Sequence, residues 1–141
     1  MLRIALVFLL FHPLLLLSQN FLPSKKFKLP EKITETSGLW AAQPDQLWWL
    51  NDSGNAAELY QTDGVGELQQ TVGIPGAVNR DWEDLTADGQ GRLFIGDFGN
   101  NANRRQDLYI YIWNSEEATL DSIRFRYPDQ EAFPPADRTE W

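Results

Sequence analysis

The sequence predicts an all-β protein, and three observations support this fold class. Short apolar runs alternate with clusters of turn residues from Ile33 onward, as in a series of short strands. No stretch of ten or more residues has a convincing helical periodicity. The order of runs and turns also repeats after about 45 residues, which is typical of stacked four-stranded units.

The first group of predicted strands lies within residues 33–78. Asp63-Gly64 separates the third strand from the fourth and is typical of a tight hairpin turn. We expect the four strands at Gly38–Ala42, at Leu47–Leu50, at Ala57–Thr62, and around Leu68, Val72 and Ile74.

The second group lies within residues 79–128 and has the same order. Its fourth strand alternates apolar residues with Arg124 and Arg126, which predicts a half-exposed strand. We expect these strands at Leu85–Ala87, at Leu93–Ile95, at Leu108–Trp113, and through Ile123, Phe125 and Tyr127.

The two groups share an Asp-x-Gly-Asn turn, at residues 52–55 and again at 97–100, 45 residues later. Four strands at this period predict β-propeller blades, because one four-stranded sheet cannot bury both of its faces alone. Closed propellers contain about four to eight blades. We therefore expect two blades, the start of a third at 129–141, and a chain that is the N-terminal part of a larger propeller. An antiparallel β-sandwich is the alternative.

Residues 1–18 have the pattern of a secretory signal peptide, with Arg3 before a leucine-rich run that ends at Ser18. A membrane anchor is the alternative, but Pro13 interrupts a run that is already short for about 30 Å of hydrocarbon. Residues 19–32 form a polar, proline-containing segment that leads into the fold, with a possible short strand at Phe27–Leu29. We expect a secreted or periplasmic protein without a stable membrane span.

The composition excludes several kinds of chemistry. Removal of residues 1–18 changes the formal net charge from −8 to −9 and removes the only histidine, and the chain has no cysteine. Residues 19–141 therefore lack a Ser-His-Asp triad, a cysteine nucleophile and the usual zinc ligands. Any metal would be a hard cation with oxygen ligands, Ca²⁺ or Mg²⁺. The acidic charge also argues against nucleic acid as a partner and favours a protein or small-molecule ligand.

The stretch Asp81-Trp82-Glu83-Asp84 is the main candidate metal site. Its three carboxylates stand just before a predicted strand, where a propeller's innermost strand would begin near the central channel. Together with Asp97 they are candidate ligands of Ca²⁺, which accepts carboxylate, amide and carbonyl oxygens. In the alternative interpretation one acid caps a turn and the others face water.

The second candidate stretch is Gly96-Asp97-Phe98-Gly99-Asn100-Asn101. Asp and Asn side chains bond to nearby backbone in turns, so a purely architectural role is one interpretation; a metal or ligand role for Asp97 and Asn100 is the other. Arg104, beside Arg105, is a candidate for binding an anionic group. The alternative is pairing of these arginines with local acids such as Asp107 or Glu83.

Three motifs resemble those of a group of secreted, largely uncharacterised bacterial β-propeller proteins. They are ETSGL at 35–39, NRDWEDL at 79–85, and GDFGNN at 96–101 with Arg104. The group is distantly similar to NHL-type and esterase-like phytase propellers, and the resemblance covers residues 33–141. It implies further blades beyond residue 141. The phytase-like link would imply hydrolysis of phosphate esters with Ca²⁺.

Two functions remain open from the sequence. The first is an exported β-propeller binding or scaffold domain of unknown ligand, with or without a structural Ca²⁺ ion. The second is a metal-assisted hydrolase of phosphoesters or esters, with the carboxylates at the propeller channel as metal ligands or general base. The candidates for these roles are Asp81, Glu83, Asp84 and Asp97.

Overall fold

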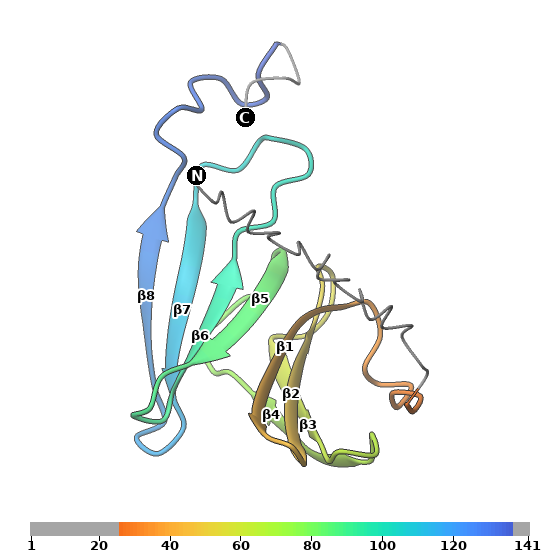
Figure 1. Cartoon of the computed structure of the whole chain (residues 1–141). Coiled ribbons are helices and arrows are strands. Elements are labelled where there is room, and N and C mark those ends of the chain that lie inside the picture. Colours follow the sequence, from red (N-terminus) through yellow and green to blue (C-terminus); the bar gives the residue numbers. More distant parts are fainter. Residues whose placement is uncertain (1–25, 137–141) are drawn as a thin grey trace, which may run out of the picture.

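A computed structural model describes residues 26–136, which form two four-stranded antiparallel sheets and contain no helix (Figure 1). Within this part of the chain, no helix is long and apolar enough to span a membrane. The strands are β1 (Thr36–Gln43), β2 (Gln46–Asn51), β3 (Glu58–Thr62), β4 (Leu68–Gly73), β5 (Trp82–Ala87), β6 (Arg92–Asp97), β7 (Leu108–Asn114) and β8 (Thr119–Phe125).

Each sheet is a meander in which sequential strands are neighbours. The pairing of the first two strands is irregular at the same place in both sheets. In the first sheet the register shifts between Thr36 and Gly38, opposite the end of β2. In the second sheet it shifts between Trp82 and Asp84, opposite the end of β6. Such a bulge bends the start of β1 and of β5 where each strand leaves the preceding loop.

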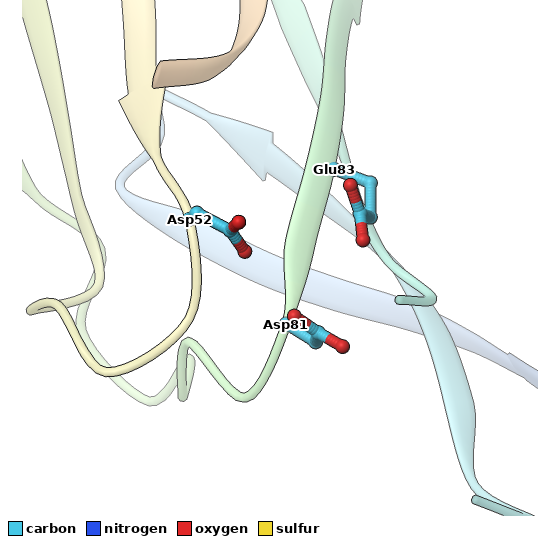
Figure 2. A group of neighbouring side chains, drawn as sticks. All are labelled: Asp52, Asp81 and Glu83. Carbon is cyan, nitrogen blue, oxygen red and sulfur yellow. The ribbon is translucent and has the colours of Figure 1, made fainter. Parts of the chain in front are cut away.

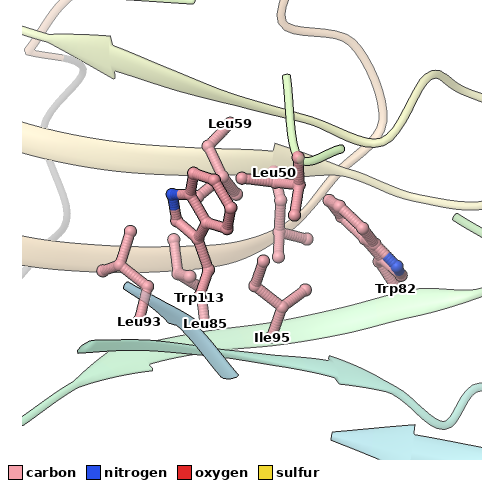
Figure 3. Close-up of a cluster of buried hydrophobic side chains, with 8 residues drawn as sticks. Leu50, Leu59, Trp82, Leu85, Leu93, Ile95 and Trp113 are labelled. Atoms are coloured by element: carbon pink, nitrogen blue, oxygen red, sulfur yellow. The ribbon is translucent and has the colours of Figure 1, made fainter. Parts of the chain in front are cut away.

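The hydrophobic core lies between the two sheets (Figure 3). Because side chains alternate across a strand, each sheet contributes one apolar face to it. Both sheets therefore share one core and stabilise each other by burying these faces. Its buried members are Leu50, Leu59, Ile74, Trp82, Leu85, Leu93, Ile95 and Trp113.

The sheets approach each other closely where β1 meets β5. A Cβ atom on Gly38 would lie 3.1 Å from the Cα and carbonyl carbon of Asp84 and 3.1 Å from the Cγ atom of Leu50. Glycine at this position therefore lets the backbone of β1 lie against the backbone of β5. This contact brings the C-terminal end of β2 and the start of β5 to one edge of the molecule.

The prediction of an all-β fold is confirmed, and a strand is present at each of the eight expected places. Two of them are displaced: β5 begins at Trp82, so most of the acidic stretch lies within the strand and not before it, and β8 begins and ends earlier than expected. Phe27–Leu29 forms no strand. The Phe27 ring instead packs against Gly66, whose positive φ of 89° and lack of a side chain accommodate it. The expected signal peptide (1–18) and the last five residues of the expected third-blade segment (129–141) lie outside the described residues.

Candidate functional site

Three carboxylates from the two sheets converge at one edge of the molecule. Asp52 directly follows β2, Asp81 directly precedes β5, and Glu83 is the second residue of β5. One carboxylate oxygen from each residue lies within 4.8 Å of the other two, and all three residues are half-buried (Figure 2). We call Asp52, Asp81 and Glu83 the carboxylate cluster.

Asn79 ties the two halves of the cluster together. Its side-chain nitrogen donates hydrogen bonds to the backbone carbonyls of Asn51 and Asp52, both at 2.9 Å. Its side-chain oxygen accepts a hydrogen bond from the Trp82 amide at 3.1 Å. One asparagine therefore joins the segment that carries Asp52 to the strand that carries Glu83. The Asp52 amide also donates to the carbonyl of Glu35 at 3.0 Å, which fixes this segment from the other side.

Hydrogen bonds of its backbone amide and carbonyl fix the position of Asp81. Its amide donates to the Oδ1 atom of Asp97 at 3.0 Å, and its carbonyl accepts from the Gly99 amide at 3.0 Å. The next carbonyl, that of Trp82, accepts from the hydroxyl of Ser37 at 2.6 Å. The start of β5 is thus bonded both to β1 and to the loop that follows β6.

Gly99 lies directly against the cluster. A Cβ atom at this position would overlap with the carboxylate groups of Asp81 and Glu83. A side chain at this position would displace these carboxylate groups, so glycine lets the loop backbone approach the two acids in their present positions. This contact gives Gly99 a role in the site in addition to its place in the turn.

Burial and mutual repulsion destabilise the charged forms of the cluster. Burial raises the pKa of Asp81, and the contact with Asp52 and its charge raise it further, while Arg105 and Ser53 act in the opposite direction. Burial also raises the pKa of Glu83, and the charges of Asp52 and Asp81 add to this increase. A bound cation would relieve this repulsion, because an opposite charge favours the charged form of a carboxylate.

Asp97 lies outside the carboxylate cluster. Its side chain is fully buried and forms an ion pair of 2.9 Å with the Nη1 atom of Arg105. Arg105 also donates to the backbone carbonyls of Asp97, Gly99 and Asp107 at 3.0–3.2 Å. The Oδ2 atom of Asp97 is buried without a hydrogen-bond partner among the described residues. In this arrangement Asp97 anchors the loop between β6 and β7.

The remaining candidates from the sequence occupy separate positions. Asp84 is exposed, and its Oδ1 atom accepts from the amide of Leu85 at 2.8 Å. The Oδ1 atom of Asn100 accepts from the amides of Arg104 and Arg105 at 2.9 and 2.8 Å, so it shapes the turn. Arg104 is exposed. Of the sequence candidates, the structure brings Asp81 and Glu83 together in the carboxylate cluster, and Asn100 lines the same cleft as Glu83.

A cleft of about 530 Å³ opens beside the cluster, and Glu83 belongs to both. Its walls come from β5, from the loop between β6 and β7, and from the segment that follows β8. The residues that line it are Glu83, Phe98, Gly99, Asn100, Asn101, Asn103, Tyr127, Asp129 and Gln130.

Asp52 is the member of the cluster that the sequence did not single out. It stands in the first Asp-x-Gly-Asn turn, which has an architectural explanation from sequence alone. The signal that could have found it is the packing of the first strands of the two sheets on each other, which places the end of β2 near the start of β5. In comparisons with known proteins, no family model, no curated protein and no solved structure matches this chain.

Proposed function

We propose that this protein is an exported binding or scaffold domain of the β-propeller type that holds a Ca²⁺ ion between Asp52, Asp81 and Glu83. The observation that carries the proposal is the convergence of these three carboxylates, from two sheets, to within 4.8 Å of one another. Like charges this close repel each other, and a bound cation would relieve this repulsion.

The propeller assignment is supported by the matching organisation of the two sheets. Both are four-stranded antiparallel meanders, and both have a register shift at the start of their first strand. They pack face to face through apolar side chains, with close contact between their first strands. Radial stacking of such sheets is the arrangement of propeller blades.

Calcium suits the ligands of the cluster. Ca²⁺ binds six to eight oxygen atoms at 2.3–2.6 Å in flexible geometries, and carboxylates bind it through one or both oxygens. Three carboxylates supply part of this shell, and water or ligand oxygens can complete it. Mg²⁺ requires a nearly ideal octahedral geometry and retains several of its water ligands. This requirement fits less well with acids that lie on one strand and next to the ends of two strands.

The signal-peptide pattern at residues 1–18 predicts export, and export is consistent with a calcium site of the extracellular type. Calcium sites of extracellular modules have dissociation constants of about 10⁻⁴–10⁻³ M. A half-buried cluster with three carboxylates is consistent with this range of dissociation constants. With such an affinity, the site would hold the ion outside the cell and release it inside the cell.

A metal-assisted hydrolase is the second candidate, and one observation favours it. Glu83 has a raised pKa and lines the cleft, which is the environment of a general base or acid. If Glu83 acts in this way on a phosphoester or ester, Glu83→Gln in the full chain abolishes turnover without lowering the melting temperature. An unchanged rate contradicts hydrolysis through Glu83.

Thermal unfolding with and without Ca²⁺ tests the binding proposal. A ligand that binds only the folded protein raises the melting temperature as its concentration passes the dissociation constant. We expect an increase with millimolar Ca²⁺ over EDTA and a smaller increase with Asp81→Asn. The same melting temperature in Ca²⁺ and EDTA would contradict a calcium site.

A further inference from the structure

The cleft beside Glu83 has the size of a small-molecule site. Its volume is about 530 Å³, and ligand pockets are commonly about 300–1,000 Å³. Three separate segments form its walls, and Figure 1 shows that the loop between β6 and β7 and the segment after β8 lie at the same end of the second sheet. The cleft therefore depends on the tertiary fold and is not the space inside one loop.

The two loop walls are fixed by hydrogen bonds. The Gln130 side chain donates to the backbone carbonyl of Asn103 at 3.0 Å, which joins the segment after β8 to the β6–β7 loop. Arg105 donates to the Gly99 carbonyl at 3.0 Å while it pairs with buried Asp97. These bonds preorganise the cleft, so a ligand would not have to order it.

One wall is aromatic. Phe98 and Tyr127 line the cleft, and the Phe125 ring contacts both of their rings. The Phe98 and Phe125 ring centroids are 6.5 Å apart, and those of Phe125 and Tyr127 are 6.1 Å apart, in edge-on arrangements. The Tyr127 side chain remains 46% exposed. An exposed aromatic ring held in place by its neighbours provides a rigid apolar surface for stacking.

The other walls are polar, and the described residues in them carry no positive charge. Asn101 and Asn103 provide amide groups, and Glu83 and Asp129 provide carboxylates. Among residues 26–136, the cleft lining contains no lysine or arginine, and the guanidinium of nearby Arg105 is occupied by Asp97 and three backbone carbonyls. Amides donate and accept hydrogen bonds, whereas carboxylates only accept. The lining therefore suits hydroxyl groups, which do both, and disfavours an anion.

We propose that this cleft binds a neutral carbohydrate. The apolar face of a pyranose ring would stack on Tyr127, and its hydroxyl groups would bond to the amides of Asn101 and Asn103 and to the carboxylate of Asp129. An ammonium ligand would use the carboxylates and the rings but would leave the amide donors without partners. The proposal goes beyond the calcium site, because these four residues lie outside the carboxylate cluster.

A glycan array tests the inference with the protein applied in Ca²⁺ and, separately, in EDTA. The array carries neutral gluco-, manno-, galacto- and N-acetylglucosamine oligosaccharides, acidic glycans, and an immobilised polyamine. We expect binding to at least one neutral class in both buffers. Tyr127→Ala should weaken this binding about tenfold, because the stacking surface is lost.

Tyr127→Phe is the matched control. It keeps the ring and removes only the hydroxyl, so its binding should remain within about threefold of the unaltered protein. Four outcomes overturn the proposal. The first three are no neutral glycan bound, equal binding by Tyr127→Ala, and preference for the acidic glycans or the polyamine. The fourth is complete loss of glycan binding in EDTA, since recognition would then depend on the cation. Failure of the calcium proposal would appear separately, as absence of a Ca²⁺-dependent thermal shift with glycan binding intact.

Discussion

Asp97 and Arg105 form an ion pair of 2.9 Å beneath the loop that joins β6 to β7. The Asp97 side chain is completely buried, and its Oδ1 atom also accepts from the amide of Asp81. Arg105 bonds to the carbonyl of Gly99, the residue that lies against the carboxylate cluster. This buried pair therefore positions both the backbone of Asp81 and the loop that packs against its carboxylate.

Replacement of Arg105 should destabilise the whole fold. Arg105→Met leaves the Asp97 carboxylate buried without a counter-charge, and breaking a buried pair from one side costs about 3–5 kcal/mol. Urea denaturation measures this loss as a decrease in the free energy of unfolding. The control is Arg104→Met, which changes an exposed arginine next to it and should cost less than about 0.5 kcal/mol. Equal effects of the two variants would show that the pair does not anchor the loop.

Gly99→Ala should weaken calcium binding. The added methyl group would overlap with the carboxylates of Asp81 and Glu83, so at least one of them must move away from the cluster. We expect the dissociation constant for Ca²⁺ to rise about tenfold, because Ca²⁺ affinity depends on the number of charged ligands and the rigidity of the site. Isothermal titration calorimetry measures this change.

Gly89→Ala is the control for this substitution. Gly89 has open space around the position of an added Cβ atom and lies in a turn away from the cluster. It should bind Ca²⁺ as the unaltered protein does. The role of Gly99 is refuted if both variants keep the original affinity.

Gly38→Ala should weaken the packing of one sheet on the other. Its methyl group would lie 3.1 Å from backbone atoms of Asp84, which cannot move aside without shifting β5. Overpacking of this kind costs about 1–3 kcal/mol, which thermal or urea unfolding detects. Gly73→Ala is the control, since nothing lies within 4 Å of that position. A Gly38→Ala protein as stable as the control would show that the sheets do not depend on this contact.

Stability without Ca²⁺ should fall as the pH rises from acid. The pKa values of Asp81 and Glu83 are raised in the folded protein above their ordinary values of 3.8 and 4.5. Between the ordinary and the raised values the folded state binds more protons than the unfolded state, so the free energy of unfolding decreases with increasing pH. Urea denaturation in EDTA between about pH 4 and pH 7 should show this loss relative to a protein with Asp81→Asn and Glu83→Gln.

Addition of Ca²⁺ should reverse this trend near neutral pH, because the cation requires the deprotonated carboxylates. Identical pH profiles for the unaltered protein and the double variant would mean that the cluster is not strained by its charge.

Much of the fold followed from the sequence because each strand is marked locally. Wholly apolar runs such as Leu47–Leu50 and Leu93–Ile95, closed by Asp-x-Gly-Asn turns, become β2 and β6, which are inner strands of their sheets. Strand ends were less predictable, as Tyr127 shows by lying beyond β8. Tyr127 continues the alternation of apolar residues that predicted the strand, but its side chain lines the cleft.

The site was only partly predictable because its members depend on contact between the sheets. Asp81 and Glu83 were recognisable as neighbouring acids, whereas Asp52 joins them through the packing of β1 against β5 and the bonds of Asn79. The repeated Asp-x-Gly-Asn turn also suggests an equivalence between the two sheets that is wrong by one residue. Sequence alignment matches Asp52 with Asp97, but the strand pairing matches Asn51, opposite Thr36, with Asp97, opposite Trp82.

This one-residue difference separates the roles of the two aspartates. Asp97 is the last residue of its strand and points into the interior toward Arg105. Asp52 follows the end of β2, and its carboxylate reaches the acids at the start of β5. Alternation of side chains along the backbone therefore places one in the interior and the other in the half-buried cluster.

Calorimetric titration of Ca²⁺ into the unaltered protein and into Asp52→Asn tests the central claim most directly. Asp52 is the informative residue, because only the packing of the two sheets assigns it to the same site as Asp81 and Glu83. We predict one Ca²⁺ ion per chain with a dissociation constant of about 10⁻⁴–10⁻³ M, and affinity about tenfold or more weaker in Asp52→Asn, with its fold unchanged by circular dichroism. No heat of binding in the unaltered protein, or the same affinity in Asp52→Asn, would contradict a calcium site built from both sheets.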